Sequence, residues 1–489
     1  MDNTQLIILS SIALPFIASA LNLTLHKFEN LRDALTLIAA VGTFILVLLV
    51  LEDFNDGTLL EFSLLTVMPG LEIAFHIEPL GLLFGIVASG LWIVTHLYAV
   101  GYMRGNKEKH RARFFACFSI AIGTVLGLAF SKNLFTLFIF YEILTLSTFP
   151  LVAHKGTPEA MAGAKTYLKI LLGTSVGLQL IAIISVYIFA GTLDFTSQGI
   201  LEGKVTNFQA TVLLALFAFG IGKAALMPFH KWLPAAMVAP TPVSALLHAV
   251  AVVKAGVFTM LKVGVYIFGV DFLKETGASN WLIWLAAFSI LSASIVAMTK
   301  DNLKARLAYS TISQLSYITL GLALANSLGV LGGSLHIATH ALGKITLFMC
   351  AGSIYVATHR TKVSELDGLG RIMPITFGAF LIGALSIIGL PPLGGSWSKW
   401  LLVLSAIEAE HMLIVAAFMI SSLLNVAYLL PIVSRGFFAK SSNGASGENG
   451  GIKEAPILCW LPTVITASGC LALFLYGGVV HNFLIPITN

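Results

Sequence analysis

Long apolar stretches separated by short polar loops run through this chain, and they restrict its fold more than any other feature. Of the 489 residues, 57% are hydrophobic and only 10% are charged, whereas soluble domains contain about 25% charged residues. A helix needs about 20 mostly apolar residues to cross the hydrocarbon core of a bilayer. The sequence therefore predicts an all-α polytopic membrane protein.

The length criterion predicts about fourteen transmembrane helices. Residues 5–24 lack the basic segment and the small-residue cleavage site of a secretory signal, so we interpret them as the first span. The predicted spans are 5–24, 34–51, 79–100, 112–130, 133–153, 163–190, 209–235, 243–268, 281–299, 304–325, 330–357, 372–405, 412–434 and 457–478.

The basic residues of the loops support this count and give an orientation. Cytoplasmic loops of membrane proteins are enriched in Lys and Arg. If both termini lie outside, the outer loops contain only Lys132, Lys204 and Lys274, and the outer loop 52–78 is acidic. We therefore expect a multi-pass protein of a prokaryotic plasma membrane with both termini outside. The predicted inner loops are 25–33, 101–113, 154–162, 300–306, 358–371 and 435–456.

Proline residues interrupt two of the predicted spans, 209–235 and 372–405. Proline removes a backbone donor and clashes with the preceding turn. Irregular backbone at membrane depth is tolerated only where it is buried in protein or lines a polar cavity. A pair of interrupted helices, one in each half, indicates a transporter built from inverted repeats. The predicted helix breaks are at Pro228, Pro234, Pro391 and Pro392.

The two interrupted helices are five positions apart in the predicted order, and an odd spacing reverses the direction of a helix. We therefore expect two inverted five-helix repeats, helices 4–8 and 9–13. The predicted parts are N-terminal helices 1–3 (1–111), the first repeat (112–268), the second repeat (281–434), and a linker with helix 14 (435–489). Within the last part, 441–451 is of low complexity and is typical of a solvated linker.

Charged residues deep inside the predicted spans are the candidate functional groups: Glu142, Lys223, Lys254, Lys344 and Lys399. A charge near the bilayer centre costs at least about 2.5–3.5 kcal/mol, so it is rarely kept without a function. One acid and four bases in one membrane chain indicate a route for protons or small cations.

Two histidines extend this set. His336 and His340 precede Lys344 by eight and four residues, respectively, so the three share one helix face and suit a proton relay. That face has no carboxylate, and we expect no metal there. His248 and Lys254 are six residues apart and lie on different faces, although both can line one cavity.

Structural explanations compete with these roles. Glu142 is also suited to a purely structural ion pair, and Lys223 to capping the carbonyl groups that the helix break frees. Lys399 lies between two tryptophans near the end of its span, where a lysine can extend its ammonium to the membrane interface. We expect the same snorkelling of Lys262.

Several common functional motifs are absent from the sequence. It has no GxxxxGK[ST] loop for ATP, no CxxCH, no cysteine cluster for iron and sulfur, and no nucleophile elbow. No basic stripe with interleaved aromatic residues indicates nucleic acid. We expect no cofactor, and an ion-transport subunit without a redox centre of its own instead of an enzyme.

The motifs resemble those of a known family, the proton-conducting membrane subunits of Mrp-type cation/proton antiporters, respiratory complex I and membrane hydrogenases. The stretch 222–248 (GKAALMPFHKWLPAAMVAPTPVSALLH) resembles the signature of this family, and so do Tyr141-Glu142 and the stretches 300–314, 340–344 and 389–392. The resemblance covers nearly the whole chain. It implies fourteen helices in two inverted repeats, proton transfer along a hydrated central axis, and other membrane subunits as partners.

The resemblance also assigns residues. It places the helix-5 glutamate of the family on Glu142, the helix-7 lysine on Lys223, the helix-8 histidine and lysine on His248 and Lys254, the helix-11 lysine on Lys344 and the helix-12 lysine on Lys399. Where the family usually has an aspartate at the start of helix 3, this chain has Glu78.

The leading hypothesis is a proton-translocating subunit of a multi-subunit antiporter that exchanges protons for Na+ or another monovalent cation. The alternative is an antiporter-like pump subunit of a complex I-type NADH:quinone oxidoreductase or a membrane-bound hydrogenase. A membrane-embedded acyltransferase that uses His340 and Glu142 is a remote alternative, because the sequence has no nucleophile motif. A scaffold with inactive channels is disfavoured by the lysines on every key helix.

Overall fold

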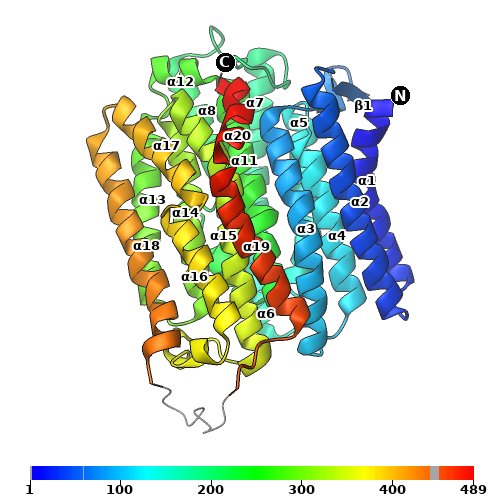
Figure 1. The fold of residues 1–489 in the computed structure, drawn as a ribbon. Helices are drawn as coiled ribbons and strands as arrows, with labels where there is room; N and C mark the ends of the chain where they lie inside the picture. The colour runs from blue at the N-terminus through cyan, green and yellow to red at the C-terminus, as the bar shows by residue number, and fades with distance from the viewer. Residues whose placement is uncertain (1–2, 59, 441–450, 489) are drawn as a thin grey trace.

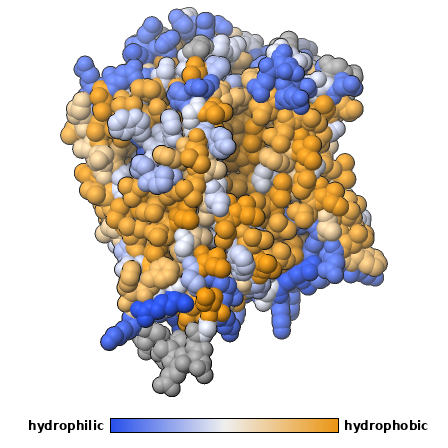
Figure 2. Space-filling model, viewed as in Figure 1, coloured by the Kyte–Doolittle hydropathy of each residue, from blue (hydrophilic) through white to orange (hydrophobic). Residues whose placement is uncertain are grey.

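The computed structural model describes residues 3–58, 60–440 and 451–488, which form a bundle of long, roughly parallel helices (Figure 1). The two ends of the chain lie at the same end of the bundle, as an even number of crossings requires. Figure 2 shows a broad hydrophobic band around the middle of the molecule and hydrophilic residues at both ends. This pattern is that of a protein whose middle faces lipid.

The N-terminal part contains α1 (Asn3–Thr24), α2 (Glu29–Asn55), β1 (Glu61–Met68), β2 (Leu71–His76), α3 (Pro79–Gly105), α4 (Arg111–Ala129) and α5 (Leu134–Val152). The middle part contains α6 (Pro158–Thr174), η1 (Ser175–Gln179), α7 (Leu180–Ala190), α8 (Asn207–Gly220), η2 (Gly222–Ala224), α9 (Trp232–Ala235), η3 (Ala236–Val238), α10 (Thr241–Ala245), η4 (Leu246–Val250), α11 (Val252–Val263), η5 (Gly264–Phe268) and α12 (Val270–Thr276). The last part contains α13 (Asn280–Thr299), α14 (Leu303–Ala323), α15 (Ser327–Thr358), η6 (Val363–Glu365), η7 (Leu369–Arg371), α16 (Pro374–Ile388), α17 (Gly395–Glu408), α18 (Met412–Phe438), α19 (Ile457–Leu475), α20 (Gly477–Leu484) and η8 (Ile485–Thr488).

The predicted spans fall on these helices or on runs of consecutive short helices, and the count of fourteen stays a prediction. Within the described residues, 10 helices are long and apolar enough to cross a membrane, or up to 11 if the pair Val252–Phe268 and Val270–Thr276, bent by 77°, counts as one span. The predicted span 304–325 corresponds to α14, and the spans 209–235 and 372–405 are divided into shorter helices. The prediction of an all-α polytopic fold is confirmed. The inverted repeats and the domain boundaries stay predictions, and most of the linker 441–451 lies outside the described residues.

A β-hairpin replaces part of the expected acidic loop 52–78. Strands β1 and β2 pair antiparallel, with Glu61 opposite His76, and the register shifts twice along the hairpin. Residue Phe75 of β2 also forms a bridge with Ser131, between α4 and α5. The hairpin therefore covers the ends of the helices on the side of the bundle where the chain begins.

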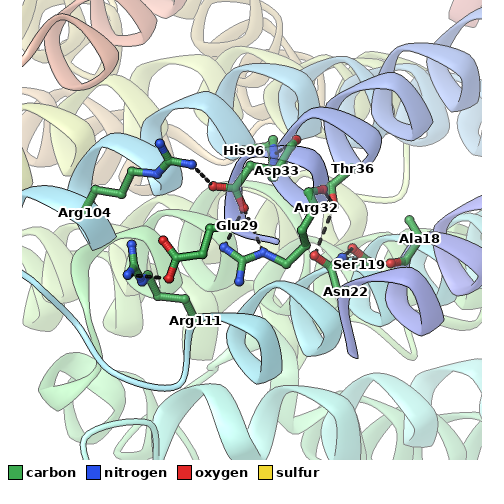
Figure 3. A network of polar contacts seen from close by, with 10 residues as sticks. All are labelled: Ala18, Asn22, Glu29, Arg32, Asp33, Thr36, His96, Arg104, Arg111 and Ser119. Carbon is green, nitrogen blue, oxygen red and sulfur yellow. Dashed lines mark hydrogen bonds and ion pairs between the residues drawn. The ribbon is translucent and has the colours of Figure 1, made fainter. Parts of the chain in front are cut away.

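A network of polar contacts joins α1, α2, α3 and α4 at the opposite end of the bundle (Figure 3). We expected Arg32 in an inner loop, 25–33, but it lies on α2 and its side chain is only 2% exposed. Its guanidinium is paired with Asp33, which also pairs with Arg104 of α3. The ring of His96 contacts the backbone oxygen of Asp33 at 2.9 Å. The Asp33 carboxylate explains why Arg32 is buried on α2 and not in a loop, because it supplies the counter-charge that a buried arginine requires.

Helix α15 lies in the interior of the bundle and carries most of the candidate relay. It contacts α14, α16, α17 and α19, and nearly all its side chains are buried. Glycines permit this close packing: a Cβ atom on Gly329 would lie 2.2 Å from the backbone oxygen of Gly321 on α14. Small residues let membrane helices approach closely in this way. The candidate side chains of α15 therefore face protein and not lipid.

Candidate functional site

The first helix break lies between α8 and α9 and holds Lys223. A short 3-10 turn, η2, replaces the α-helix at 222–224, and Ala225 adopts a positive φ of 54°. Pro228 lies in the irregular segment as predicted. The prediction for Pro234 is wrong, because this residue lies inside the short helix α9. Proline is tolerated there, since the first N–H groups of a helix have no intrahelical partner.

Lys223 is fully buried, and the broken backbone directs it towards α5. Its Nζ donates to the backbone oxygen of Tyr141 at 2.7 Å and to Oγ1 of Thr145 at 2.6 Å. The same ammonium lies 3.1 Å from the centre of the Tyr141 ring, a distance at which a cation is attracted by the face of an aromatic ring. Lys223 is thus solvated by neutral groups of α5.

Glu142 lies next to Tyr141, yet it does not form an ion pair with Lys223 among the described residues. Both carboxylate oxygens are buried and lack a hydrogen-bond partner in this part of the chain. Instead, Thr145, about one helical turn after Glu142 on α5, accepts a hydrogen bond from the Lys223 ammonium. The structural explanation of Glu142 as a permanent ion pair is therefore wrong for this arrangement.

Lys254 and His340 form a contact between α11 and α15, which belong to the two different predicted repeats. Nζ of Lys254 on α11 lies 2.7 Å from Nδ1 of His340 on α15, and both residues are buried. A lysine and an imidazole at hydrogen-bond distance can share a proton, because each group accepts a proton when it is neutral and donates one when it is charged. The sequence indicated each residue separately but not this contact.

The line of polar groups continues from His340 towards the second helix break. The rings of His336 and His340 have centroids 5.7 Å apart, and Nδ1 of His336 lies 2.8 Å from Oγ of Ser398 on α17. His336 also stacks on Tyr317 of α14 at 5.8 Å. Ser398 and Tyr317 were missed from the sequence, since serine and tyrosine are common in membrane helices and carry no charge.

Lys344 points away from this line, towards α14. Its Nζ donates to Oγ of Ser310 at 2.6 Å and to the backbone oxygen of Leu307 at 3.3 Å. The hydroxyl of Tyr428 on α18 donates to the same Ser310 oxygen at 2.8 Å. Lys344 is fully buried and bound by neutral oxygens, as Lys223 is.

The second break, between α16 and α17, holds Lys399. Gly389 ends α16 with a positive φ of 92°, and Pro391 and Pro392 follow it as predicted. Nζ of Lys399 donates to the freed backbone oxygen of Ile388 at 3.1 Å and lies 4.8 Å from the centre of the Tyr317 ring. Because Lys399 is only 7% exposed and points into the break, the snorkelling explanation is wrong.

The prediction that Lys262 snorkels to the membrane interface is also wrong. It is 1% exposed, and its Nζ lies 2.9 Å from Oε1 of Glu78 and donates to the backbone oxygen of Ser131 at 2.7 Å. Among the buried lysines that the structure describes, Lys262 is the one that is ion-paired with a carboxylate. His248 lies on η4, and its side chain is outside what the structure describes.

Comparison with known proteins identifies the family. Residues 131–425 match the model described as NADH:quinone oxidoreductase/Mrp antiporter, TM, and residues 68–115 match the one described as NADH-Ubiquinone oxidoreductase (complex I), chain 5 N-terminus. The chain belongs to the NADH:quinone oxidoreductase/Mrp antiporter family. It is an antiporter-like, proton-translocating membrane subunit, and the resemblance found from its motifs is confirmed.

Two relatives of this chain are subunits of quinone oxidoreductases, and its fold is similar to that of a chain in an Mrp complex. The chain is 34% identical over 379 residues to NADH-quinone oxidoreductase subunit N of Desulforudis audaxviator, covering 75% of this chain and 73% of the relative. It is 32% identical over 361 residues to NAD(P)H-quinone oxidoreductase chain 5 of a Picosynechococcus species, covering 70% of this chain and about half (53%) of the relative. The fold matches a chain of the Mrp complex from Dietzia sp. DQ12-45-1b with a TM-score of 0.86, 21% identity and coverage of 100% and 97% of the two chains.

Proposed function

We propose that this chain is a proton-translocating subunit of a multi-subunit monovalent cation/proton antiporter and that it corresponds to the D subunit of the Mrp type. The run Tyr-Glu-Ile-Leu-Thr-Leu-Ser-Thr-Phe-Pro at 141–150 and the match to an Mrp complex over the whole chain support this assignment. The partners are the other membrane subunits of the antiporter, and the cation is Na+ or another monovalent cation. The protein spans a prokaryotic plasma membrane with both termini outside.

The contact between Lys254 and His340 carries the proposal. A proton relay needs titratable groups close enough to exchange a proton directly or through one water. Nζ of Lys254 and Nδ1 of His340 meet this condition at 2.7 Å. His336 and Ser398 extend the line to the second break, where Lys399 lies beside Tyr317. Protons cross the molecule along this line. Lys344, four residues after His340 on α15, and His248 belong to the proposed path as well, although the Lys344 ammonium is bound to Ser310 of α14 in the structure.

Glu142 and Lys223 are the gate of this path. In the structure the ammonium of Lys223 is bound by Tyr141 and Thr145, while the buried carboxylate of Glu142 has no hydrogen-bond partner among the described residues. When the carboxylate approaches the ammonium, their attraction holds the proton on the lysine. When it moves away, the lysine releases its proton towards Lys254. Protons leave at Lys399 or pass to a neighbouring subunit.

Proton flux in vesicles tests this proposal. The complex is purified with its partner subunits and reconstituted with a pH-sensitive dye inside, and a cation gradient is applied. Glu142→Ala, Lys223→Ala and Lys254→Met are expected to abolish flux with unchanged subunit composition. Lys169→Ala is the matched control, because Lys169 lies exposed on α6. Wild-type flux in the Glu142 and Lys223 variants refutes the proposal.

The second candidate is an antiporter-like subunit of a complex I-type oxidoreductase or a membrane-bound hydrogenase. The names of the two relatives above favour it, since both are subunits of quinone oxidoreductases. Identification of the subunits that copurify with the chain separates the two candidates. Small membrane subunits without redox centres support the antiporter, and iron–sulfur or quinone-binding subunits support the oxidoreductase.

A further inference from the structure

The buried ion pair between Glu78 and Lys262 differs from every other lysine contact of the site. Lys223, Lys344 and Lys399 donate to neutral oxygens, whereas Lys262 lies 2.9 Å from a carboxylate, with side chains 1% and 8% exposed. Burying two charges costs several kcal/mol per ion, which their attraction only partly returns. The desolvation cost therefore makes this ion pair a poor way to join the start of α3 to α11 if it has only a structural role.

The pair lies where irregular backbone and polar groups gather. The π-helix η5 follows directly after Lys262 on α11, and its residue Tyr266 interacts with the Glu78 carboxylate. Single-turn π-helices occur frequently at functional sites. Nζ of Lys262 also lies 4.5 Å from the centre of the Phe195 ring. The Lys262 ammonium is thus held by the Phe195 ring as well as by Glu78, and the Glu78 carboxylate has Tyr266 as a second polar neighbour.

A group of partly exposed titratable residues continues from the pair to the surface at the β-hairpin. Nδ1 of His76 lies 3.6 Å from Oε2 of Glu61, and both side chains are 36% exposed. Lys132 forms an ion pair with the other oxygen of Glu61. Burial lowers the pKa of His76, and the charge of Glu78 opposes this shift. His76, two residues before Glu78 in the chain, thus lies between the buried pair and the partly exposed ion pairs of the hairpin.

On the side away from the hairpin, the pair of Glu78 and Lys262 is linked by helix α11 to Lys254, a residue of the proposed proton path. Lys262 and Lys254 lie on the same helix, α11, eight residues apart, which corresponds to about 12 Å along the helix axis. Lys254 contacts His340 and so belongs to the line that joins the two halves. Water molecules can bridge the remaining distance between polar groups in a protein interior.

We propose that Glu78 and Lys262 form the outer proton-transfer site of this chain, which connects Lys254 with the aqueous surface at the β-hairpin. This inference rests on the proposed function. In the transfer step, an N–H bond of the Lys262 ammonium breaks and an O–H bond forms on Glu78, which leaves a neutral amine and a neutral acid. Glu78 then gives the proton to His76 or to water, and Lys262 takes up the next proton from the side of Lys254.

Two substitutions distinguish proton transfer from a purely structural ion pair. Lys262→Arg keeps the charge and the ion pair, but a guanidinium is not deprotonated in proteins. The double substitution Glu78→Gln and Lys262→Met removes both charges together, which is often tolerated without loss of stability. A structural role predicts wild-type flux in both variants. A transfer role predicts a loss of flux of ~10-fold or more, since one positioned acid–base group usually contributes about 10²–10⁴-fold to a rate.

The measurement is proton flux of the reconstituted complex, normalised to the amount of assembled subunits. Lys169→Arg on the exposed face of α6 is the control for the lysine-to-arginine change. Wild-type flux in either variant overturns the inference. If Lys262→Arg retains flux while Glu142→Ala and Lys223→Ala lose it, the outer site is wrong and the proposed function stands. If Lys223→Ala retains flux, the proposed function itself fails.

Discussion

Asp33→Ala tests whether the polar network of Figure 3 stabilises the first four helices through a buried charge. The carboxylate accepts from Arg32 at 2.9 Å (Nε) and 2.6 Å (Nη2), and from Nη2 of Arg104 at 2.5 Å. Arg32 is 2% exposed and cannot turn to solvent, whereas Arg104 is 37% exposed. Removing Asp33 therefore leaves one guanidinium buried without a counter-charge.

The magnitude follows from this burial. Removing one partner of a buried ion pair costs ~3–5 kcal/mol, because the other charge stays uncompensated. The Phe115 ring, 5.2 Å from the Arg32 guanidinium, keeps part of its electrostatic contact. We therefore expect the lower end, a loss of about 3 kcal/mol in the free energy of unfolding. Glu29→Ala is the matched control: Glu29 lies one turn earlier on α2 and pairs with Arg111 at 2.6 Å, but the two side chains are 42% and 24% exposed. This substitution is expected to cost less than ~1 kcal/mol.

Denaturant unfolding of the purified protein in detergent, followed by tryptophan fluorescence, measures both values. A double variant, Arg32→Met with Asp33→Ala, removes the uncompensated charge and is expected to recover most of the lost stability. The reasoning is refuted if Asp33→Ala is as mild as Glu29→Ala. It is also refuted if the double variant is as unstable as Asp33→Ala, because the loss would then not come from the buried guanidinium.

Two further predictions concern the first break and the surface next to α5. A Cβ atom on Gly256 of α11 would lie 2.3 Å from the backbone of Lys223 and Ala224. Gly256→Ala should therefore lower the free energy of unfolding by ~1–3 kcal/mol and reduce proton flux. Gly173 has open space where its Cβ would lie, so Gly173→Ala should change neither quantity, and unfolding and flux assays compare the two variants. Burial lowers the pKa of His154, which follows α5, to about 4 from 6.5, so the unfolded chain binds more protons between these values and stability should fall as the pH decreases from about 6.5 to about 4. His154→Gln should flatten this part of the stability profile, whereas substitution of the exposed His26 should leave its slope unchanged.

The length and composition of the apolar stretches predict the spans, because a bilayer imposes its thickness on every helix. Local chemistry also predicts both breaks, at Pro228 and at Pro391. The hairpin at 61–76 was missed, since its shifted register gives no strict alternation of apolar and polar residues. Arg32 was placed in a loop because a single charged residue at a span end is ordinarily solvated. Its burial depends on the ion pair with Asp33, which also binds Arg104, a residue distant in sequence.

In the candidate site, the sequence predicts contacts between residues of one helix but not contacts between residues of different helices. Helical periodicity correctly places His336 and His340 side by side, since both lie on α15. It cannot give the partner of Lys254, which depends on the packing of α11 against α15, nor the one-turn offset that brings Thr145 instead of Glu142 to Lys223. Two buried lysines of the described residues therefore differ: Lys262 is in contact with the Glu78 carboxylate, whereas Lys223 is bound by Thr145 and not by the Glu142 carboxylate. The gate mechanism requires each acid to move between contact with its lysine and separation from it. The structure has Glu78 and Lys262 in contact and Glu142 and Lys223 separated, so the two lysines need not release their protons at the same time.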